Sequence, residues 1–136
     1  MGELQSLALS CVVLLSSCGS ASVTKGSLDQ PVALRIDQSV EYPAEDLRVG
    51  FREVKNDSRC PTHAVCVWEG FATVVLWVKK GSEPRQELSL SSSNQAGHST
   101  RGECLGYEIE VLGLAPPNSG HLRQSDYRVT LAVRAK

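Results

Sequence analysis

The sequence predicts an all-β fold, a single antiparallel β-sandwich or barrel-like domain, from three observations. Apolar and polar residues alternate in several short stretches, which is the period of a half-buried strand. Turn signals rich in proline, glycine and serine separate these stretches. Hydrophobic residues make up 41% of the chain but aromatic residues only 5%, so the core must consist mostly of valine, leucine, isoleucine and alanine. The β-branched members of this set favour pleated strands.

The charge balance and the absence of two hydrolase motifs argue against nucleic-acid binding and against hydrolytic catalysis. The chain has 136 residues and a formal net charge of -1, which is enough for one domain and gives no basic excess to hold nucleic acid. It contains neither a Gly-x-Ser-x-Gly elbow nor a His-Glu-x-x-His motif. We therefore expect a monomer that is not an enzyme, has no cofactor and does not bind nucleic acid.

The N-terminus has the features of an export signal. The apolar stretch 4–15 is too short for a membrane-spanning helix, which needs about 20 residues, but it fits the apolar region of a secretory signal. Leu15-Ser16-Ser17-Cys18 follows it and resembles the lipobox of bacterial lipoproteins. The alternative is an N-terminal helix of the domain.

The lipobox resemblance implies how the protein is processed and where in the cell it is located. In such lipoproteins residues 1–17 would be removed as a signal peptide, and Cys18 would be lipidated and become the new N-terminus. The membrane is then a partner through the acyl chains. The location is the cell envelope, and Gly19 after the cysteine implies an outer membrane, facing the periplasm, in a bacterium with two membranes.

Residues 18–30 are expected to connect the lipid to the domain. The segment is small and polar, so we expect a flexible tether that leaves the domain without a fixed orientation. The β-sandwich domain itself is predicted to cover residues 31–136.

The first predicted strands follow this tether. Val32, Leu34 and Ile36 alternate with polar residues, and residues 43–46 form a turn. Alternation resumes over residues 47–52, and Val54 then falls one position out of phase. A β-bulge near Arg52 and Glu53 would return Val54 to the core.

The longest and most buried strand is predicted over Val67 to Val78. Both of its faces are apolar, which is typical of a strand covered on both sides. Trp68, at the start of this run, is expected to pack over the preceding loop as part of the core.

The C-terminal half predicts shorter strands. They are separated by a polar loop over 91–102 and by the proline-rich turn 114–120, which cannot pair inside a sheet. The predicted strands cover residues 87–90, 107–111 and 127–134. No helix is predicted in the mature chain.

Cys60 and Cys66 are the candidates for a disulfide. Exported proteins keep paired thiols oxidised, and six extended residues would hold the two Cα atoms about 20 Å apart. The chain must therefore turn back between them, and Pro61 favours such a turn. We predict a Cys60–Cys66 bond and a free Cys104, although Cys104 could instead pair with either cysteine and close a ring of about forty residues.

The segment around this pair carries a second resemblance. The run Asp57-Ser58-Arg59-Cys60-Pro61 and the later Cys66-Val67-Trp68-Glu69-Gly70 resemble a pattern of small, uncharacterised exported bacterial proteins with a lipobox and a β-rich body. The resemblance implies a location and a fold. It implies no activity.

Metal binding is the alternative chemistry for this segment. Cys60, His63 and Cys66 recur at every third position, and Asp57 or Cys104 could supply a fourth ligand. Pro61 argues against a regular helix there, and oxidised cysteines cannot bind metal as thiolates. The expectation is therefore no metal.

Three hypotheses remain for the function. The first is a lipid-anchored binding or structural module that contacts another envelope component through its loops. The second is an inhibitor-like module that presents the Cys60–Cys66 loop to an enzyme, which requires Thr62 to Val65 to project into solvent. The third is a metal or redox protein. The candidate binding-loop residues are Asp57, Arg59, Thr62, His63 and Trp68.

Overall fold

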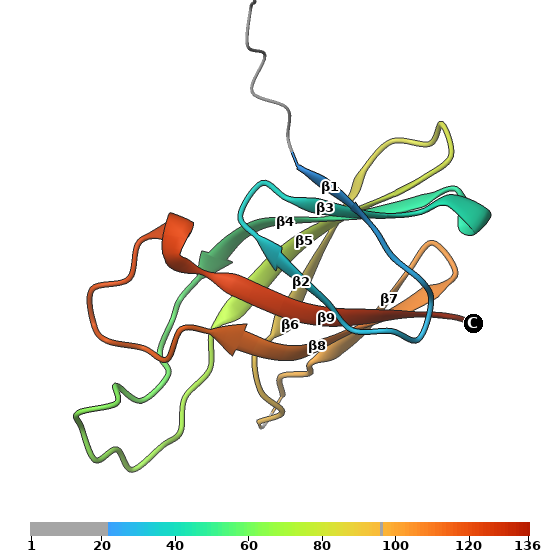
Figure 1. Cartoon of the computed structure of the whole chain (residues 1–136). Helices are drawn as coiled ribbons and strands as arrows, with labels where there is room; N and C mark the ends of the chain where they lie inside the picture. Colours follow the sequence, from blue (N-terminus) through green and yellow to red (C-terminus); the bar gives the residue numbers. More distant parts are fainter. Residues whose placement is uncertain (1–21, 96) are drawn as a thin grey trace, which may run out of the picture.

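Two β-sheets pack face to face in the computed structural model, which describes residues 22–95 and 97–136 (Figure 1). The first sheet has the order β1-β3-β4-β5-β6 and the second β2-β9-β8-β7. This confirms the predicted all-β fold, and the arrangement is that of a sandwich. All strand pairs are antiparallel except β1 with β3. The strands are β1 (Val23–Lys25), β2 (Val32–Arg35), β3 (Ser39–Tyr42), β4 (Leu47–Lys55), β5 (Thr73–Lys80), β6 (Gln86–Ser91), β7 (Arg101–Cys104), β8 (Tyr107–Ala115) and β9 (Arg128–Ala135).

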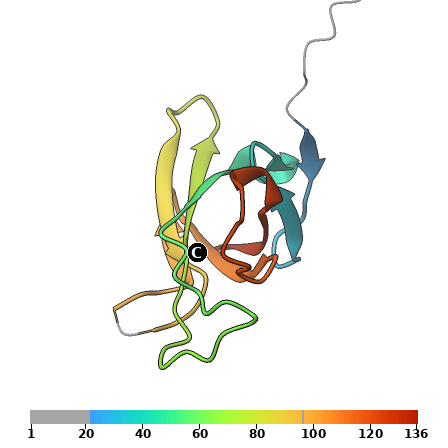
Figure 2. The same cartoon turned by 90° about the vertical axis from the view of Figure 1, so that its left-hand side faces the viewer.

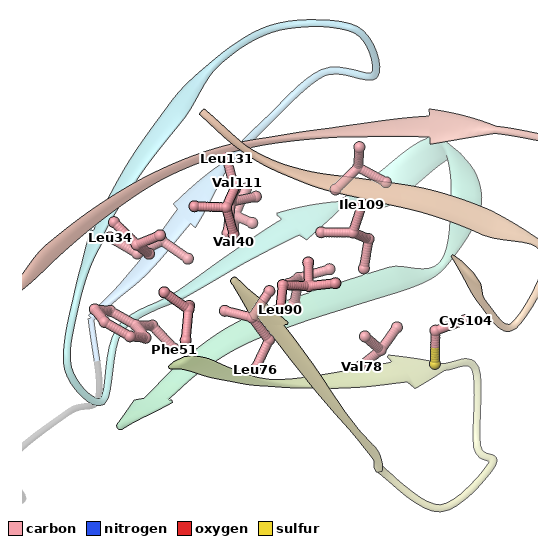
Figure 3. Packing of buried hydrophobic residues seen from close by; sticks show 14 of the residues in the cluster. Leu34, Val40, Phe51, Leu76, Val78, Leu90, Cys104, Ile109, Val111 and Leu131 are labelled. Atoms are coloured by element: carbon pink, nitrogen blue, oxygen red, sulfur yellow. The ribbon is translucent and has the colours of Figure 1, made fainter. Parts of the chain in front are cut away.

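The core lies between the two sheets and consists mainly of valine and leucine, as the composition predicts. Phe51 and Leu76 of the first sheet and Leu34, Ile109 and Leu131 of the second point into this shared space (Figure 3). All five are fully buried. The alternation of apolar and polar residues along each strand therefore matches the side that faces the opposite sheet.

The bulge predicted near Arg52 and Glu53 is confirmed. The pairing of β4 with β5 shifts by one residue between Phe51 and Glu53. Because of this shift, Val54 returns to the core side and is only 5% exposed. The predicted turn at 43–46 is also present, as the 3-10 helix η1 (Pro43–Glu45) followed by Asp46 in the left-handed region.

The prediction for the start of β5 is wrong. The strand begins at Thr73, six residues after Val67, and at eight residues it is one shorter than β4 and β8. Val67 and Trp68 belong to the preceding loop, where they are 98% and 77% exposed. The later half of the prediction is correct, because β5 pairs with β4 on one side and β6 on the other, and Val75 is fully buried.

Two features of strand pairing in the C-terminal half were not predicted from the sequence. β7 begins in the last two residues of the predicted polar loop and pairs with β8. A Cβ atom at Gly102 would lie 2.7 Å from a Leu90 methyl group, so glycine permits the close approach of β7 to β6. β8 continues through a second register shift, and Leu114 and Ala115 pair with β9 instead of opening the turn.

The prediction of a flexible tether up to Gln30 is wrong for the part that the structure describes. Residues 23–25 form β1 beside β3, the Asp29 amide donates to the Val133 carbonyl at 2.9 Å, and Leu28 packs against the core. The domain thus begins before residue 31. Cys18 and the predicted signal peptide lie outside the described residues, so their processing stays a prediction. Within residues 22–95 and 97–136, no helix has the length and apolar character needed to cross a membrane.

Candidate binding loop

A long loop between β4 and β5 carries the residues that the sequence singled out. Its two arms leave the sheet side by side, because the Ser58 amide donates to the Phe71 carbonyl at 2.9 Å and the Cys60 amide to the Glu69 carbonyl at 2.8 Å. Gly70 has a φ of 71°, and a Cβ atom there would lie 1.9 Å from the Ser58 carbonyl oxygen. Glycine is therefore required at this neck.

The disulfide closes the loop directly beyond the neck. Cys60 and Cys66 are bonded, with their Cα atoms 5.9 Å apart, as predicted. Between them the Ala64 amide donates to the Pro61 carbonyl at 3.0 Å, which completes the turn that Pro61 was expected to favour. The tip is thus a small covalent ring on a hydrogen-bonded stem.

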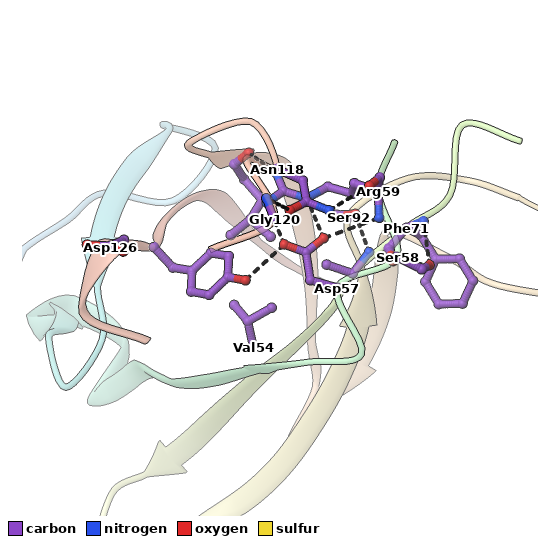
Figure 4. A network of polar contacts seen from close by, with 12 residues as sticks. Val54, Asp57, Ser58, Arg59, Phe71, Ser92, Asn118, Gly120 and Asp126 are labelled. Atoms are coloured by element: carbon purple, nitrogen blue, oxygen red, sulfur yellow. Dashed lines mark hydrogen bonds and ion pairs between the residues drawn. The ribbon is translucent and has the colours of Figure 1, made fainter. Parts of the chain in front are cut away.

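A partly buried ion pair fixes the base of the loop. The Arg59 guanidinium donates Nε to Asp57 Oδ1 at 2.9 Å and Nη2 to Oδ2 at 2.8 Å (Figure 4). The two side chains are only 15% and 12% exposed. The low exposure and the two parallel hydrogen bonds make this pair stronger than an ion pair on an open surface.

Tyr127, which directly precedes β9 of the second sheet, contacts the same carboxylate. Its hydroxyl donates to Asp57 Oδ2 at 2.8 Å. Burial alone would raise the pKa of Asp57, but the hydrogen bonds from Arg59 and Tyr127 and the charge of Arg59 outweigh it, so the pKa is lowered. Burial, together with the hydrogen bond to Asp57, raises the pKa of Tyr127 to about 12.

The turn after β8 supports the loop from one side. Arg59 Nη1 donates to the Leu114 carbonyl at 2.9 Å, and the Asn118 amide group donates to the Arg59 carbonyl at 2.7 Å. The Thr62 amide in turn donates to the Asn118 carbonyl at 3.1 Å. A segment predicted only as a proline-rich turn therefore positions the disulfide loop.

The tip of the loop projects into solvent. Residues 62–69 are all exposed, and Val65 is 104% and Trp68 77% exposed. The expectation that Trp68 packs over the disulfide as core is therefore wrong. The hydrogen bonds at the neck hold the two arms together, so the tip lies beyond the reach of the sheets, and its apolar side chains have no core to enter.

An open groove of about 520 Å³ lies beside the tip. Gln95 and His98, from the loop between β6 and β7, form its other wall. Figure 2 shows both loops leaving the same end of the sandwich. The His98 ring packs against Phe71, with centroids 3.9 Å apart and the ring planes tilted by 33°. The groove is lined by Val67, Trp68, Glu69, Phe71, Gln95 and His98.

The remaining candidate chemistry does not fit this geometry. Both sulfurs of Cys60 and Cys66 are consumed by the disulfide, so neither can act as a thiolate ligand, and His63 is exposed at the tip. Among the described residues, no cluster of three His, Cys, Asp or Glu side chains could hold a metal ion. Cys104 is free and buried in β7, and burial raises the pKa of its thiol.

The fold and this site define the class of the domain. It is an all-β sandwich that presents a disulfide-closed, apolar loop on a fixed polar base. Comparisons with protein-family models, with curated proteins and with solved structures found no match for the chain.

Proposed function

We propose that the protein is a non-enzymatic, lipid-anchored module of the bacterial cell envelope that binds another envelope protein through the tip of the disulfide loop. The observation that carries the proposal is the combination of an exposed apolar tip with a partly buried, hydrogen-bonded base. Val65, Val67 and Trp68 contribute the apolar surface. Such side chains rarely gather on a monomer surface without a partner.

The construction of the loop supports this role physically. The disulfide and the contacts of Arg59 hold the backbone before any partner arrives. A partner therefore has little loop entropy to remove on binding. Tryptophan is also enriched among the residues that contribute most to binding energy at protein interfaces.

The anchor part of the proposal depends on Cys18. Val23, the first residue of β1, lies five positions after Cys18, so the link spans at most about 18 Å. β1 begins at the end of the domain opposite to the disulfide loop (Figure 1). An acylated Cys18 would then hold the domain close to the bilayer with the loop directed away from it.

Membrane fractionation tests the anchor. We expect the full-length protein to partition with membranes in a bacterial host and a Cys18→Ala variant to appear in the soluble fraction. A Cys18→Ala variant that stays membrane-bound would contradict acylation at this position.

Photo-crosslinking tests the binding role. A benzophenone amino acid is placed at Val65 in the full-length protein in its source cells, and at Leu112, an exposed apolar residue of β8, as the matched control. We expect a discrete protein adduct at Val65 and none at Leu112. Adducts only to lipid, equal adducts at both positions, or no adduct would overturn the proposal.

The inhibitor-like function is the second candidate, favoured by the exposure of Thr62 to Val65. In that case the partner is an enzyme whose active site receives the tip. Purified envelope proteases assayed with the protein test this candidate. Inhibition that a Val65→Asp variant loses would support it, and no inhibition at micromolar concentration would leave only the general binding role.

A further inference from the structure

We infer that the groove lined by Trp68, Glu69, Phe71 and His98 receives a lysine or arginine side chain of the protein partner. This inference rests on the proposed function, because it names the chemistry of the partner at the same loop. Three features of the groove lead to it: its aromatic walls, its carboxylate and its position beside the apolar tip.

The walls of the groove offer aromatic faces. Trp68 is 77% exposed, so most of its indole is free to be covered. The rings of Phe71 and His98, which pack against each other, also line the groove. A cation over the face of an indole is attracted by the ring quadrupole, and arginine is the side chain that uses this contact most often.

Glu69 supplies the charge that selects a cation. Its carboxylate is exposed, and none of the ion pairs found among the described residues involves it. The nearest arginine along the loop, Arg59, is already paired with Asp57. The groove therefore holds a negative charge that has no cation of its own.

This carboxylate also argues against other occupants. An apolar side chain would cover Glu69 without a hydrogen-bond partner, which is costly. An acidic side chain, or an anionic lipid headgroup, would meet a like charge. A guanidinium or ammonium group both stacks on the ring and pairs with the carboxylate, and it can come from a protein that covers Val65 and Val67 at the same time.

A peptide titration tests the inference. The isotopically labelled full chain in detergent is titrated with acetyl-Gly-Arg-Gly-amide and with the same peptide carrying citrulline, which keeps the shape but removes the charge. We expect saturable shifts of the Trp68 indole N–H and of the amides of Glu69 and His98 with the arginine peptide. The citrulline peptide should bind at least about fivefold more weakly.

Two substitutions separate the groove from general charge effects. Glu69→Gln should weaken binding of the arginine peptide about fivefold, whereas the matched control Glu83→Gln, an exposed acid in the turn between β5 and β6, should leave it unchanged. Trp68→Ala should abolish the shifts at His98, and Trp68→Phe should restore part of them. Equal binding of the two peptides, equal effects of the two Gln variants, or no shift would overturn the inference.

The outcomes also distinguish this inference from the function on which it rests. Crosslinking at Val65 without binding of the arginine peptide would overturn the groove inference and leave the binding role standing. Peptide binding without any protein adduct at Val65 would overturn the binding role, and with it the assignment of the cation to a protein partner.

Discussion

The hydroxyl of Tyr127 donates a 2.8 Å hydrogen bond to the carboxylate of Asp57, although the two residues are 70 positions apart in the chain. Tyr127 directly precedes β9, one of the two inner strands of the second sheet, and Asp57 lies near the start of the disulfide loop that leaves the first sheet. The contact therefore ties the base of the loop to the opposite sheet. It turns an ion pair between neighbours, Asp57 and Arg59, into a tertiary contact.

Removing this hydroxyl should destabilise the domain. Tyr127→Phe keeps the ring, which is buried, but leaves the partly buried Asp57 carboxylate with one donor fewer. Hydrogen bonds to charged groups contribute about 2 kcal/mol, so we expect the free energy of unfolding in urea to fall by that amount.

Tyr42→Phe is the matched control. The Tyr42 hydroxyl is buried, and among the described residues it has no hydrogen-bond partner, so its loss should leave stability unchanged or raise it by about 1 kcal/mol. Equal destabilisation by the two substitutions would contradict this account of both hydroxyls.

Asp57 should also make the stability depend on acid pH. Its pKa is lowered in the folded state, so the folded protein binds a proton less readily than the unfolded chain. The stabilisation is present above the unfolded pKa of about 3.9 and is lost as the pH falls through the folded value.

Comparison with Asp57→Asn isolates this effect. We expect the difference in free energy of unfolding between the wild type and the variant to be full at pH 6 and to shrink as the pH falls below about 4. Urea unfolding at a series of pH values measures it. A difference that stays constant down to the acid limit would show that Asp57 titrates at its ordinary value.

The sequence predicted the strands in which apolar and polar residues alternate along the chain. β4 is the clearest example, because the alternation of apolar and polar residues shifts by one position before Val54, and this shift predicted the bulge that the structure contains. β7 was missed because Arg101 to Cys104 shows no alternation, and its existence depends on pairing with β8, a partner that local pattern does not reveal.

In the binding loop, too, the sequence predicted what depends on nearby residues and missed what depends on the rest of the fold. Two cysteines six positions apart, with a proline between them, predicted the disulfide, because ring closure over so few residues is a local property. The exposure of Trp68 was not predicted, because an apolar run looks the same whether it enters a core or projects from it. Gly70, required where the two arms lie side by side, was the signal that separated Trp68 from β5.

Gly50→Ala should disturb the outer face of the first sheet. A Cβ atom at this position would lie 2.0 Å from the Trp77 ring, which in turn carries the Arg85 guanidinium 3.9 Å from its centroid. The indole must therefore move, and overpacking of this kind costs about 1 to 3 kcal/mol. Urea unfolding measures the loss.

Gly113→Ala in β8 is the control for this substitution. No atom lies within 4 Å of a Cβ placed there, so we expect a change of no more than about 0.5 kcal/mol. Gly50→Ala combined with Trp77→Ala should cost less than the sum of the two single variants, because the clash is then absent. Strict additivity would show that the indole does not obstruct residue 50.

The last prediction concerns the disulfide ring. The double variant Cys60→Ser and Cys66→Ser should lower the free energy of unfolding by about 2 kcal/mol, since the closed ring is short and the gain in chain entropy grows with its length. Trp68→Ala should leave stability unchanged, because the indole is 77% exposed. The two substitutions differ in effect because the bond constrains the backbone, whereas the tip side chains contact little of the domain.

Urea unfolding of the wild type and the two variants measures both changes in stability. Peptide mapping without reduction should recover Cys60 linked to Cys66. A fragment that links Cys104 to either residue, or a stability unchanged by loss of the bond, would contradict the prediction.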